Sequence, residues 1–120
     1  MEIFGDGQQT RDFVFVGDVA EALLAAASAA HSGVYNVGTG VATSVLDLSR
    51  LSAETAGVEQ QPRFSSERPG DVRHSVLDAS LAEHDLGWRA GTTVVEGVAR
   101  TWPSVGQQVG EAGRSKLDHV

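Results

Sequence analysis

Apolar residues in the first half of the chain recur at the spacing of a strand, a helix and a second strand. Residues 13–16 form a short β-branched and aromatic run, which is typical of a strand buried on both faces. A helix is expected to follow over 18–30, because Asp18 can cap it with Glu21 three residues later and apolar residues then recur at helical spacing. Residues 34–37 indicate a second strand. The pattern predicts a compact strand, helix and strand unit.

The middle of the chain alternates helical and extended patterns. Ser44 with Asp47 is expected to open a helix that Gly57 ends. An extended piece is expected over 62–65. A short helix is then predicted over 80–86, and Gly87 directly after it is expected to end it.

The last helix carries the clearest signals at its two ends. Thr93 and Glu96 form a capping box at its start, and Pro103 is expected to end it. The remaining residues contain glycine, glutamine and charges without periodicity, which is typical of a flexible tail. The sequence therefore predicts one folded portion over 1–103 and a flexible tail over 104–120.

Composition limits the classes of function. A chain of 120 residues with 41% hydrophobic content forms one domain at most. Its formal net charge of −7 repels a phosphate backbone, so nucleic-acid binding is not expected. The absence of cysteine excludes disulfides and thiol chemistry. No apolar run reaches the length of a membrane span, and the first residues do not resemble a signal peptide, so a cytoplasmic protein without membrane contact is expected.

Two loop segments carry the candidate chemistry. Arg11 lies in the run Gly-Asp-Gly-Gln-Gln-Thr-Arg-Asp-Phe-Val-Phe-Val, and Arg68 and Asp71 lie in Arg-Pro-Gly-Asp. A planar guanidinium offers a bidentate fork to phosphate oxygens and stays charged at any working pH. Two such arginines with a carboxylate could hold the diphosphate of a sugar nucleotide. The alternatives are a surface ion pair between Arg11 and Asp12, and a merely solvated turn at Arg68 in which Asp71 acts as a turn residue.

Five motifs in a fixed order resemble one family. They are Gly-Asp-Gly-x-Gln-x-Arg-Asp-Phe-Val-x-Val-x-Asp-Val, Tyr-Asn-Val-Gly-x-Gly, Thr-Ser-Val-Leu-x-Leu, Arg-Pro-Gly-Asp-Val-Arg and Leu-Gly-Trp. Over about residues 2 to 103 the chain resembles the C-terminal part of the extended short-chain dehydrogenase/reductase family, nearest to UDP-glucose 4-epimerase and related NAD-dependent epimerases and dehydratases. The resemblance implies an α/β fold, namely the last strand and helix of a Rossmann-type sheet with a small α/β substrate lobe, incomplete as an isolated domain.

The resemblance also implies roles for single residues. It implies that Arg11 and Arg68 clamp the diphosphate of a nucleotide sugar, most simply a UDP-sugar, and that Asp71 meets the ribose or a neighbouring loop. It further implies that three apolar residues line the nucleotide pocket, whereas without the resemblance ordinary core packing would be the preferred explanation. These residues are Phe4, Phe13 and Val45.

The parts that perform the family's hydride chemistry are missing from these 120 residues. That chemistry needs NAD on a glycine-rich turn and a Tyr-x-x-x-Lys pair, whereas the single tyrosine, Tyr35, and the single lysine, Lys116, lie far apart. Gly38–Gly40 indicates a turn that ends a strand rather than a phosphate-binding loop. No catalytic residue, metal site or bound cofactor is therefore expected in this chain alone, although NAD is implied for the full-length family.

Three hypotheses about function remain open from the sequence. In the first, the chain is the C-terminal substrate-binding part of an NAD-dependent nucleotide-sugar epimerase or dehydratase, and an NAD-binding N-terminal half is its partner. In the second, it is a stand-alone nucleotide-sugar-binding module without catalysis. In the third, it is a structural remnant that binds nothing.

Overall fold

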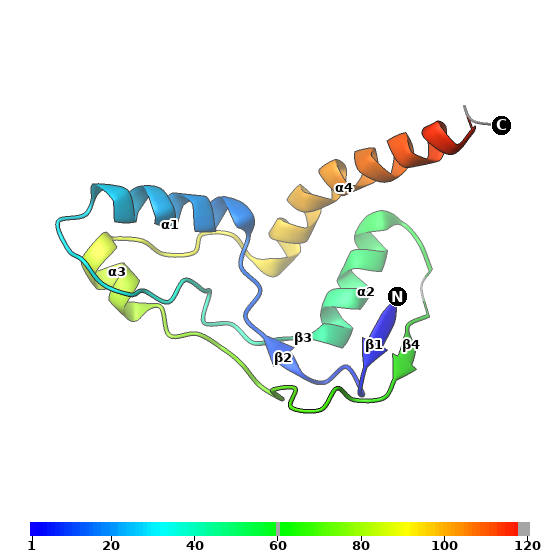
Figure 1. Ribbon diagram of the computed structural model, residues 1–120, viewed down its shortest axis with the longest axis horizontal. Coiled ribbons are helices and arrows are strands. Elements are labelled where there is room, and N and C mark those ends of the chain that lie inside the picture. The colour runs from blue at the N-terminus through cyan, green and yellow to red at the C-terminus, as the bar shows by residue number, and fades with distance from the viewer. Residues whose placement is uncertain (60, 118–120) are drawn as a thin grey trace.

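The computed structural model describes residues 1–59 and 61–117, which form four helices and two small pairs of strands. The elements follow one another as β1 (Glu2–Phe4), β2 (Thr10–Arg11), α1 (Val16–Ser28), β3 (Thr43–Ser44), α2 (Val45–Ala56), β4 (Arg63–Ser65), α3 (Ser80–Leu86) and α4 (Val94–Leu117). This mixed composition confirms the α/β class predicted from the sequence. The helices α1 and α3 lie together at one end, away from the strand pairs (Figure 1).

Two pairs of strands bring distant segments together. β1 and β4 are parallel, with Ile3 opposite Phe64, and Ile3 is the largest fully buried side chain. β2 and β3 are antiparallel, with Thr10 opposite Ser44. An isolated bridge joins Thr10 to His74, so the loop after β4 returns to the side of β2. The ends of β1 and β2 therefore lie beside the segment that follows β4.

The first predicted strand does not form. Residues 13–15 are irregular, and α1 begins at Val16 with Phe15 as its extended N-cap (φ −69°, ψ 137°). The prediction that Asp18 caps this helix is wrong, because Asp18 lies inside the first turn and its carboxylate accepts hydrogen bonds from Thr92 instead. The tertiary contact with Thr92 replaces the local cap that the sequence suggests.

The second predicted strand is also absent. Residues 34–37 belong to no strand, and no backbone hydrogen bond joins them to another segment of the described chain. A β-branched and aromatic run needs a neighbouring strand before it becomes part of a sheet, and the described residues supply none here. The helix before this segment ends at Ser28, two residues earlier than predicted, with Ala29 as its C-cap.

Local signals in the middle of the chain are confirmed. The Ser44 hydroxyl accepts a hydrogen bond from the Asp47 N–H at 3.0 Å, and Gly57 ends α2 in the left-handed conformation with φ of 68°. The extended piece at 62–65 contains β4, and α3 spans Ser80–Leu86. Capping and turn chemistry act within a few residues, so these features do not depend on distant parts of the chain.

The last helix begins as predicted but ends later. Thr93 accepts a hydrogen bond from the Glu96 N–H at 3.2 Å, and α4 then continues through Pro103 to Leu117, so the prediction that Pro103 ends it is wrong. Proline removes one helical N–H, yet the Thr101 hydroxyl donates to the Gly97 carbonyl at 2.7 Å and the Ser104 hydroxyl to the Thr101 carbonyl at 2.9 Å. These bonds support the turns on both sides of the ring. Flexibility of 104–120 stays a prediction, and its residues 118–120 lie outside the described part of the chain.

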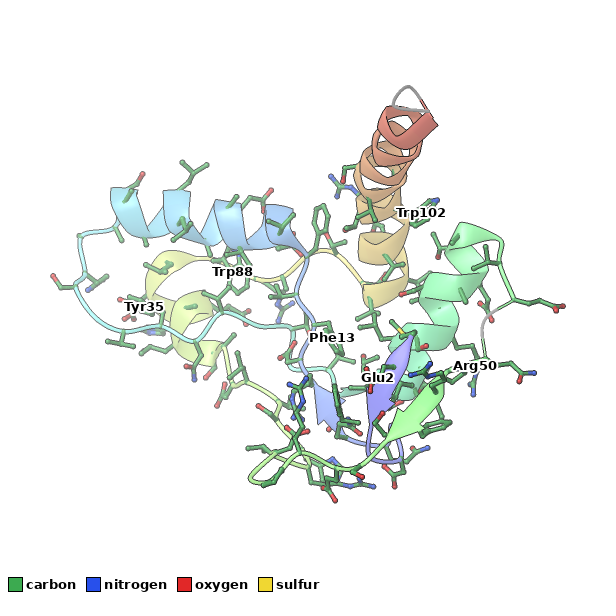
Figure 2. All side chains as sticks on the ribbon, turned by 45° about the vertical axis from the view of Figure 1, so that its right-hand side comes forward. Glu2, Phe13, Tyr35, Arg50, Trp88 and Trp102 are labelled. Carbon is green, nitrogen blue, oxygen red and sulfur yellow. The ribbon has the colours of Figure 1, made fainter. Side chains whose placement is uncertain are left out.

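The core is small and lies between α1 and α3. Ala22, Ala82 and Trp88 form its buried cluster, and Figure 2 shows Trp88 between these helices. The indole N–H of Trp88 donates to the Asp18 carbonyl at 2.9 Å, which fixes the ring against the start of α1. Within residues 1–59 and 61–117, no helix combines the length and the apolar character that crossing a membrane requires.

Candidate functional site

Glycines shape the loop that follows β1. Gly5 and Gly7 adopt φ of 78° and 76°, a left-handed conformation that other residues rarely adopt. A Cβ added at Gly7 would lie 3.1 Å from the Cβ of Leu46, so the loop also packs closely on α2. Asp6 stabilises the turn by accepting a hydrogen bond from the Gln8 N–H at 2.9 Å. The Gly-Asp-Gly run therefore sets the direction in which the chain enters β2.

Arg11 projects from β2 toward the Arg-Pro-Gly-Asp loop. Its Nη2 lies 2.7 Å from Oδ1 of Asp71, and its Nη1 donates to the Thr10 carbonyl, also at 2.7 Å. The two charged side chains are 29% and 30% exposed, so the pair is partly shielded from solvent. These contacts use two of the five N–H donors of a guanidinium and hold its plane in a fixed direction. The surface pair with Asp12 that the sequence left open is not the one that forms.

Arg68 lies over the ring of Phe4, with its Cζ 3.9 Å from the ring centroid. This is a cation–π contact, in which the cation interacts with the negative face of the ring. The Asp71 N–H donates to the Arg68 carbonyl at 3.2 Å, and Gly70 between them adopts φ of 76°. One tight turn therefore carries both Arg68 and Asp71. Four of the predicted site residues are joined by these contacts: Phe4, Arg11, Arg68 and Asp71.

Arg73 and Asp6 form a second ion pair that the sequence analysis did not assign. Nη1 and Nη2 of Arg73 lie 2.8 and 2.9 Å from the two carboxylate oxygens of Asp6. The hydrogen bond from Arg73 is the main cause that lowers the pKa of Asp6 to about 2 from 3.8, and the Gln8 N–H adds to it. Both residues lie in the motifs that carry the resemblance, so their position in Gly-Asp-Gly and Asp-Val-Arg could have indicated the pair.

A buried glutamine adds an acceptor beside Phe4. Gln9 is 8% exposed, and its Nε2 donates to the Phe4 carbonyl at 2.9 Å. Its Oε1 is buried and has no donor among the described residues. The burial of Gln9 could not be predicted from the sequence, because a glutamine in a loop carries no sign of burial.

Phe13 and Val45 occupy other surroundings. Phe13 lines an apolar cavity of about 490 Å³ between the segment 13–16, α2 and α4. Val45 is the first residue of α2, and its N–H donates to the Gln9 carbonyl at 3.0 Å. The described contacts connect neither side chain to Arg11 or Arg68, so their role as lining of a nucleotide pocket stays a prediction.

The loop Gly38–Gly40 binds a carboxylate of the chain itself. The Asp12 carboxylate accepts hydrogen bonds from the N–H groups of Thr39, Gly40 and Leu77 and from the Thr39 hydroxyl. Burial raises the pKa of Asp12, but these hydrogen bonds outweigh it and the pKa lies below its ordinary value. Because Asp12 already engages the N–H groups of this loop, the loop does not fit the phosphates of a dinucleotide, and we assign no step to NAD on these residues.

Comparison with known proteins identifies the family. The family described as GDP-mannose 4,6 dehydratase matches residues 1–101. The chain belongs to this family. Among curated members of the wider epimerase and dehydratase group, the chain is 45% identical over 101 residues to a UDP-glucose 4-epimerase of Mycolicibacterium smegmatis and 36% identical over 104 residues to a dTDP-L-rhamnose 4-epimerase of Burkholderia thailandensis. The match covers 83% of this chain in both comparisons, but 32% and 29% of the relatives.

Solved structures show the same relationship. The UDP-glucose 4-epimerase of Thermotoga maritima, solved with UDP-glucose, superposes with a TM-score of 0.86 and 38% identity over 91% of this chain and 35% of its own. The UDP-glucose 4-epimerase of Bifidobacterium longum, solved with NAD+ and UDP, gives a TM-score of 0.75 and 34% identity over 82% of this chain and 32% of its own. The epimerase/dehydratase resemblance drawn from the motifs is confirmed. The chain spans about a third of the length of the epimerases it matches.

Proposed function

We propose that this chain is the C-terminal, nucleotide-sugar-binding part of an NAD-dependent epimerase or dehydratase of the UDP-glucose 4-epimerase type. The observation that carries the proposal is the meeting of Arg11 with Asp71 and of Arg68 with Phe4, which brings two family motifs together at one site. Relatives solved with UDP-glucose or with UDP support a UDP-sugar as the ligand class. We further propose that the enzyme of which this chain is a part acts in carbohydrate metabolism in the cytoplasm.

The two arginines supply what a diphosphate requires. The net charge of the chain is −7, so binding of a dianion depends on local positive charge rather than on the average field. Arg11 is held in a fixed direction by Asp71 and by the Thr10 carbonyl, and Arg68 is held over an aromatic face. Groups that are already oriented lose less conformational entropy when a ligand binds. In this proposal Asp71 positions Arg11 and lies within the same turn as Arg68.

The proposal assigns binding to this chain and the chemical step to other residues. When bound in the family's enzymes, NAD accepts and returns a hydride at the sugar. These 120 residues supply neither a dinucleotide loop that fits nor a Tyr-x-x-x-Lys pair. The chain alone is therefore proposed to bind a UDP-sugar without turning it over.

Calorimetric titration of UDP-glucose into the 120-residue chain tests the binding role. Arg11→Ala and Arg68→Ala should each weaken binding by roughly 1.5 to 3 kcal/mol, which is at least tenfold, because each removes charge-assisted hydrogen bonds to phosphate. The matched control is Arg50→Ala, which removes an exposed arginine that pairs with Asp47 at 3.4 Å on α2. If Arg11→Ala and Arg68→Ala bound UDP-glucose as tightly as Arg50→Ala does, the two arginines would not clamp the diphosphate.

Turnover separates the proposal from its alternatives. A preparation that joins this chain to the remaining two-thirds of a relative should convert UDP-glucose in an NAD-dependent manner, whereas the chain alone should not. Binding that never leads to turnover in the joined preparation would favour the stand-alone binding module. No binding of any UDP-sugar would favour the structural remnant.

A further inference from the structure

The turn that carries Arg68 and Asp71 has little burial to hold it in place. All residues from 66 to 72 are exposed. Inside this turn, the described chain contains one backbone hydrogen bond, from the Asp71 N–H to the Arg68 carbonyl at 3.2 Å. Exposed backbone has many conformations of similar energy, so such a turn takes its direction from contacts with other segments. The positions of both site residues therefore depend on what holds the two ends of the turn.

The strands β1 and β4 hold the first end. Ser65 is the last residue of β4, and its carbonyl accepts a hydrogen bond from the Gly5 N–H at 2.8 Å. Phe4, the last residue of β1, lies under the Arg68 guanidinium. Backbone pairing between two strands fixes this end, and the ring of Phe4 adds one side-chain contact.

Arg73 holds the second end. Its Nη1 and Nη2 lie 2.8 and 2.9 Å from the two carboxylate oxygens of Asp6, and its carbonyl accepts a hydrogen bond from the Thr10 N–H at 2.9 Å. The Thr10 carbonyl in turn accepts hydrogen bonds from the Ser75 N–H at 3.1 Å and from Nη1 of Arg11 at 2.7 Å. The stretch that follows the turn therefore contacts both the Gly-Asp-Gly loop and the strand that presents Arg11.

The same stretch runs beside β2. A parallel bridge pairs Thr10 with His74, and the Thr10 hydroxyl lies 2.9 Å from Nδ1 of His74. Thr10 also pairs with Ser44 of β3, so β2 lies between β3 and this stretch. Figure 1 shows the segment after β4 passing β2 before it reaches α3. A shift of this stretch would therefore be passed on to β2 and to Arg11.

We infer that Arg73 and Asp6 are positioning residues for the diphosphate site, because their ion pair sets where Arg68 and Asp71 lie relative to Arg11. The inference rests on the proposed function for the identity of the ligand, and it adds two residues that act on the site through others. Two carboxylate oxygens that face two N–H donors of one guanidinium fix orientation as well as distance. A site whose arginines are already oriented loses less conformational entropy when the ligand binds.

The exposure of the pair separates positioning from a general effect on stability. The side chains of Arg73 and Asp6 are 47% and 58% exposed. An exposed pair contributes little to the free energy of unfolding, because solvent screens it. Loss of the pair should therefore leave the fold in place while it releases the turn.

Replacement of Asp6 distinguishes a positioning role of Arg73 from direct contact with phosphate. Arg73 engages both of its terminal nitrogens with Asp6, so direct contact with phosphate would require the pair to open. If Arg73 bound phosphate itself, removal of the Asp6 charge would free it and strengthen binding. If Arg73 positions the turn, removal of either partner weakens binding.

Calorimetric titration of UDP-glucose into the 120-residue chain tests the pair. Arg73→Gln and Asp6→Asn should each weaken binding roughly threefold or more, and the double variant should bind no more weakly than the weaker single variant, because both changes remove one interaction. Asp6→Asn keeps an oxygen that can accept the Gln8 N–H. The matched control is Arg89→Gln, which removes an exposed arginine that pairs with Glu83 at 3.0 Å and should leave the affinity unchanged.

NMR of the chain without ligand tests the position of Arg68. Its guanidinium lies over the Phe4 ring, whose ring current shifts the resonances of nearby side-chain protons upfield. In Arg73→Gln and in Asp6→Asn these resonances should move toward those of an exposed arginine, whereas in Arg89→Gln they should stay. Circular dichroism shows that each variant keeps its helices. Arg73→Lys, which keeps the charge but not the planar fork, should give intermediate resonances and intermediate affinity.

The outcomes separate this inference from the proposed function. Unchanged affinity, or unchanged Arg68 resonances, in both Arg73→Gln and Asp6→Asn would overturn the positioning role. Tighter binding by Asp6→Asn would overturn it as well, because Arg73 would then bind the phosphate directly. Weaker binding in Arg11→Ala without weaker binding in Arg73→Gln would keep the proposed function and contradict the positioning role. Arg68 resonances that move in a chain whose UDP-glucose affinity does not depend on Arg11 or Arg68 would keep the hold of the pair on the turn and contradict the proposed function.

Discussion

The guanidinium of Arg11 and the carboxylate of Asp71 lie 2.7 Å apart, although 60 positions separate them in the sequence. This ion pair connects the run that begins with Gly-Asp-Gly to the turn Arg-Pro-Gly-Asp. A second pair, Arg73 with Asp6, joins the same two segments at 2.8 Å. The two motifs are therefore tied together twice before any ligand is considered.

Replacing Asp71 should affect binding less than replacing Arg11. Asp71→Asn leaves the charge of Arg11 in place and removes only a partner that orients it. We expect the free energy of unfolding to fall by less than ~1 kcal/mol, because both side chains are nearly a third exposed. Affinity for UDP-glucose should fall less than in Arg11→Ala, as measured by calorimetry. If Asp71→Asn weakened binding as much as Arg11→Ala does, Asp71 would have to contact the ligand directly.

The Asp6 carboxyl should titrate at unusually low pH. Its pKa in the folded chain is about 2, below the ordinary 3.8, because Arg73 and the Gln8 N–H donate hydrogen bonds to it. A carboxyl with a lowered pKa stabilises the fold above its ordinary pKa, and this stabilisation is lost as the pH falls from 3.8 toward 2. NMR titration of the Asp6 side chain should give that midpoint. In Arg73→Gln the midpoint should rise toward 3.8, and an unchanged value would contradict the ion pair.

Asp12 should contribute more to stability than a typical surface carboxylate. Its carboxylate accepts hydrogen bonds from Thr39, Gly40 and Leu77, so Asp12→Ala leaves several partly buried donors without an acceptor. We expect a loss of about 2 to 4 kcal/mol in the free energy of unfolding, measured with urea. The control is Asp47→Ala, whose side chain is 64% exposed. That variant should change the free energy of unfolding by less than ~1 kcal/mol. Similar losses in the two variants would show that the hydrogen bonds to the Asp12 carboxylate do not stabilise the fold.

Pro103 should limit the stability of α4. It lies inside the helix, where its ring removes the hydrogen bond to the Ala99 carbonyl. Pro103→Ala restores that bond and should stabilise the helix by up to about 3 kcal/mol. Far-UV circular dichroism during heating should show the gain, while Ser104→Ala should show none. A loss of helix in Pro103→Ala would mean that α4 depends on the proline.

Helix caps and helix ends could be predicted from the sequence where the residues that form them lie within a few positions of one another. The Ser44 cap, the ends of α2 and α3 at Gly57 and Gly87, and the span of α3 were predicted and are confirmed. The motif order also indicated the family and selected six site residues. The structure joins Phe4, Arg11, Arg68 and Asp71 by direct contacts, whereas Phe13 and Val45 lie in other surroundings.

Three features that depend on distant partners were predicted wrongly or missed. Asp18 resembles an N-cap in sequence, but Thr92, 74 positions away, supplies its hydrogen bonds. Residues 34–37 have strand composition but no strand to pair with in the described chain. The role of Arg73 was missed because its partner, Asp6, is 67 positions away.

The family, the Ser44 cap and the helix ends at Gly57 and Gly87 could be read from the sequence, because they depend on residue types at short and fixed spacing. The tertiary structure alone decided which carboxylate pairs with each arginine, that Asp12 engages the N–H groups of the Gly38–Gly40 loop, and which apolar faces stay uncovered. The physical reason is that ion pairs and burial depend on distances in space, and a distance between residues 60 or more positions apart is set only when the whole chain is folded.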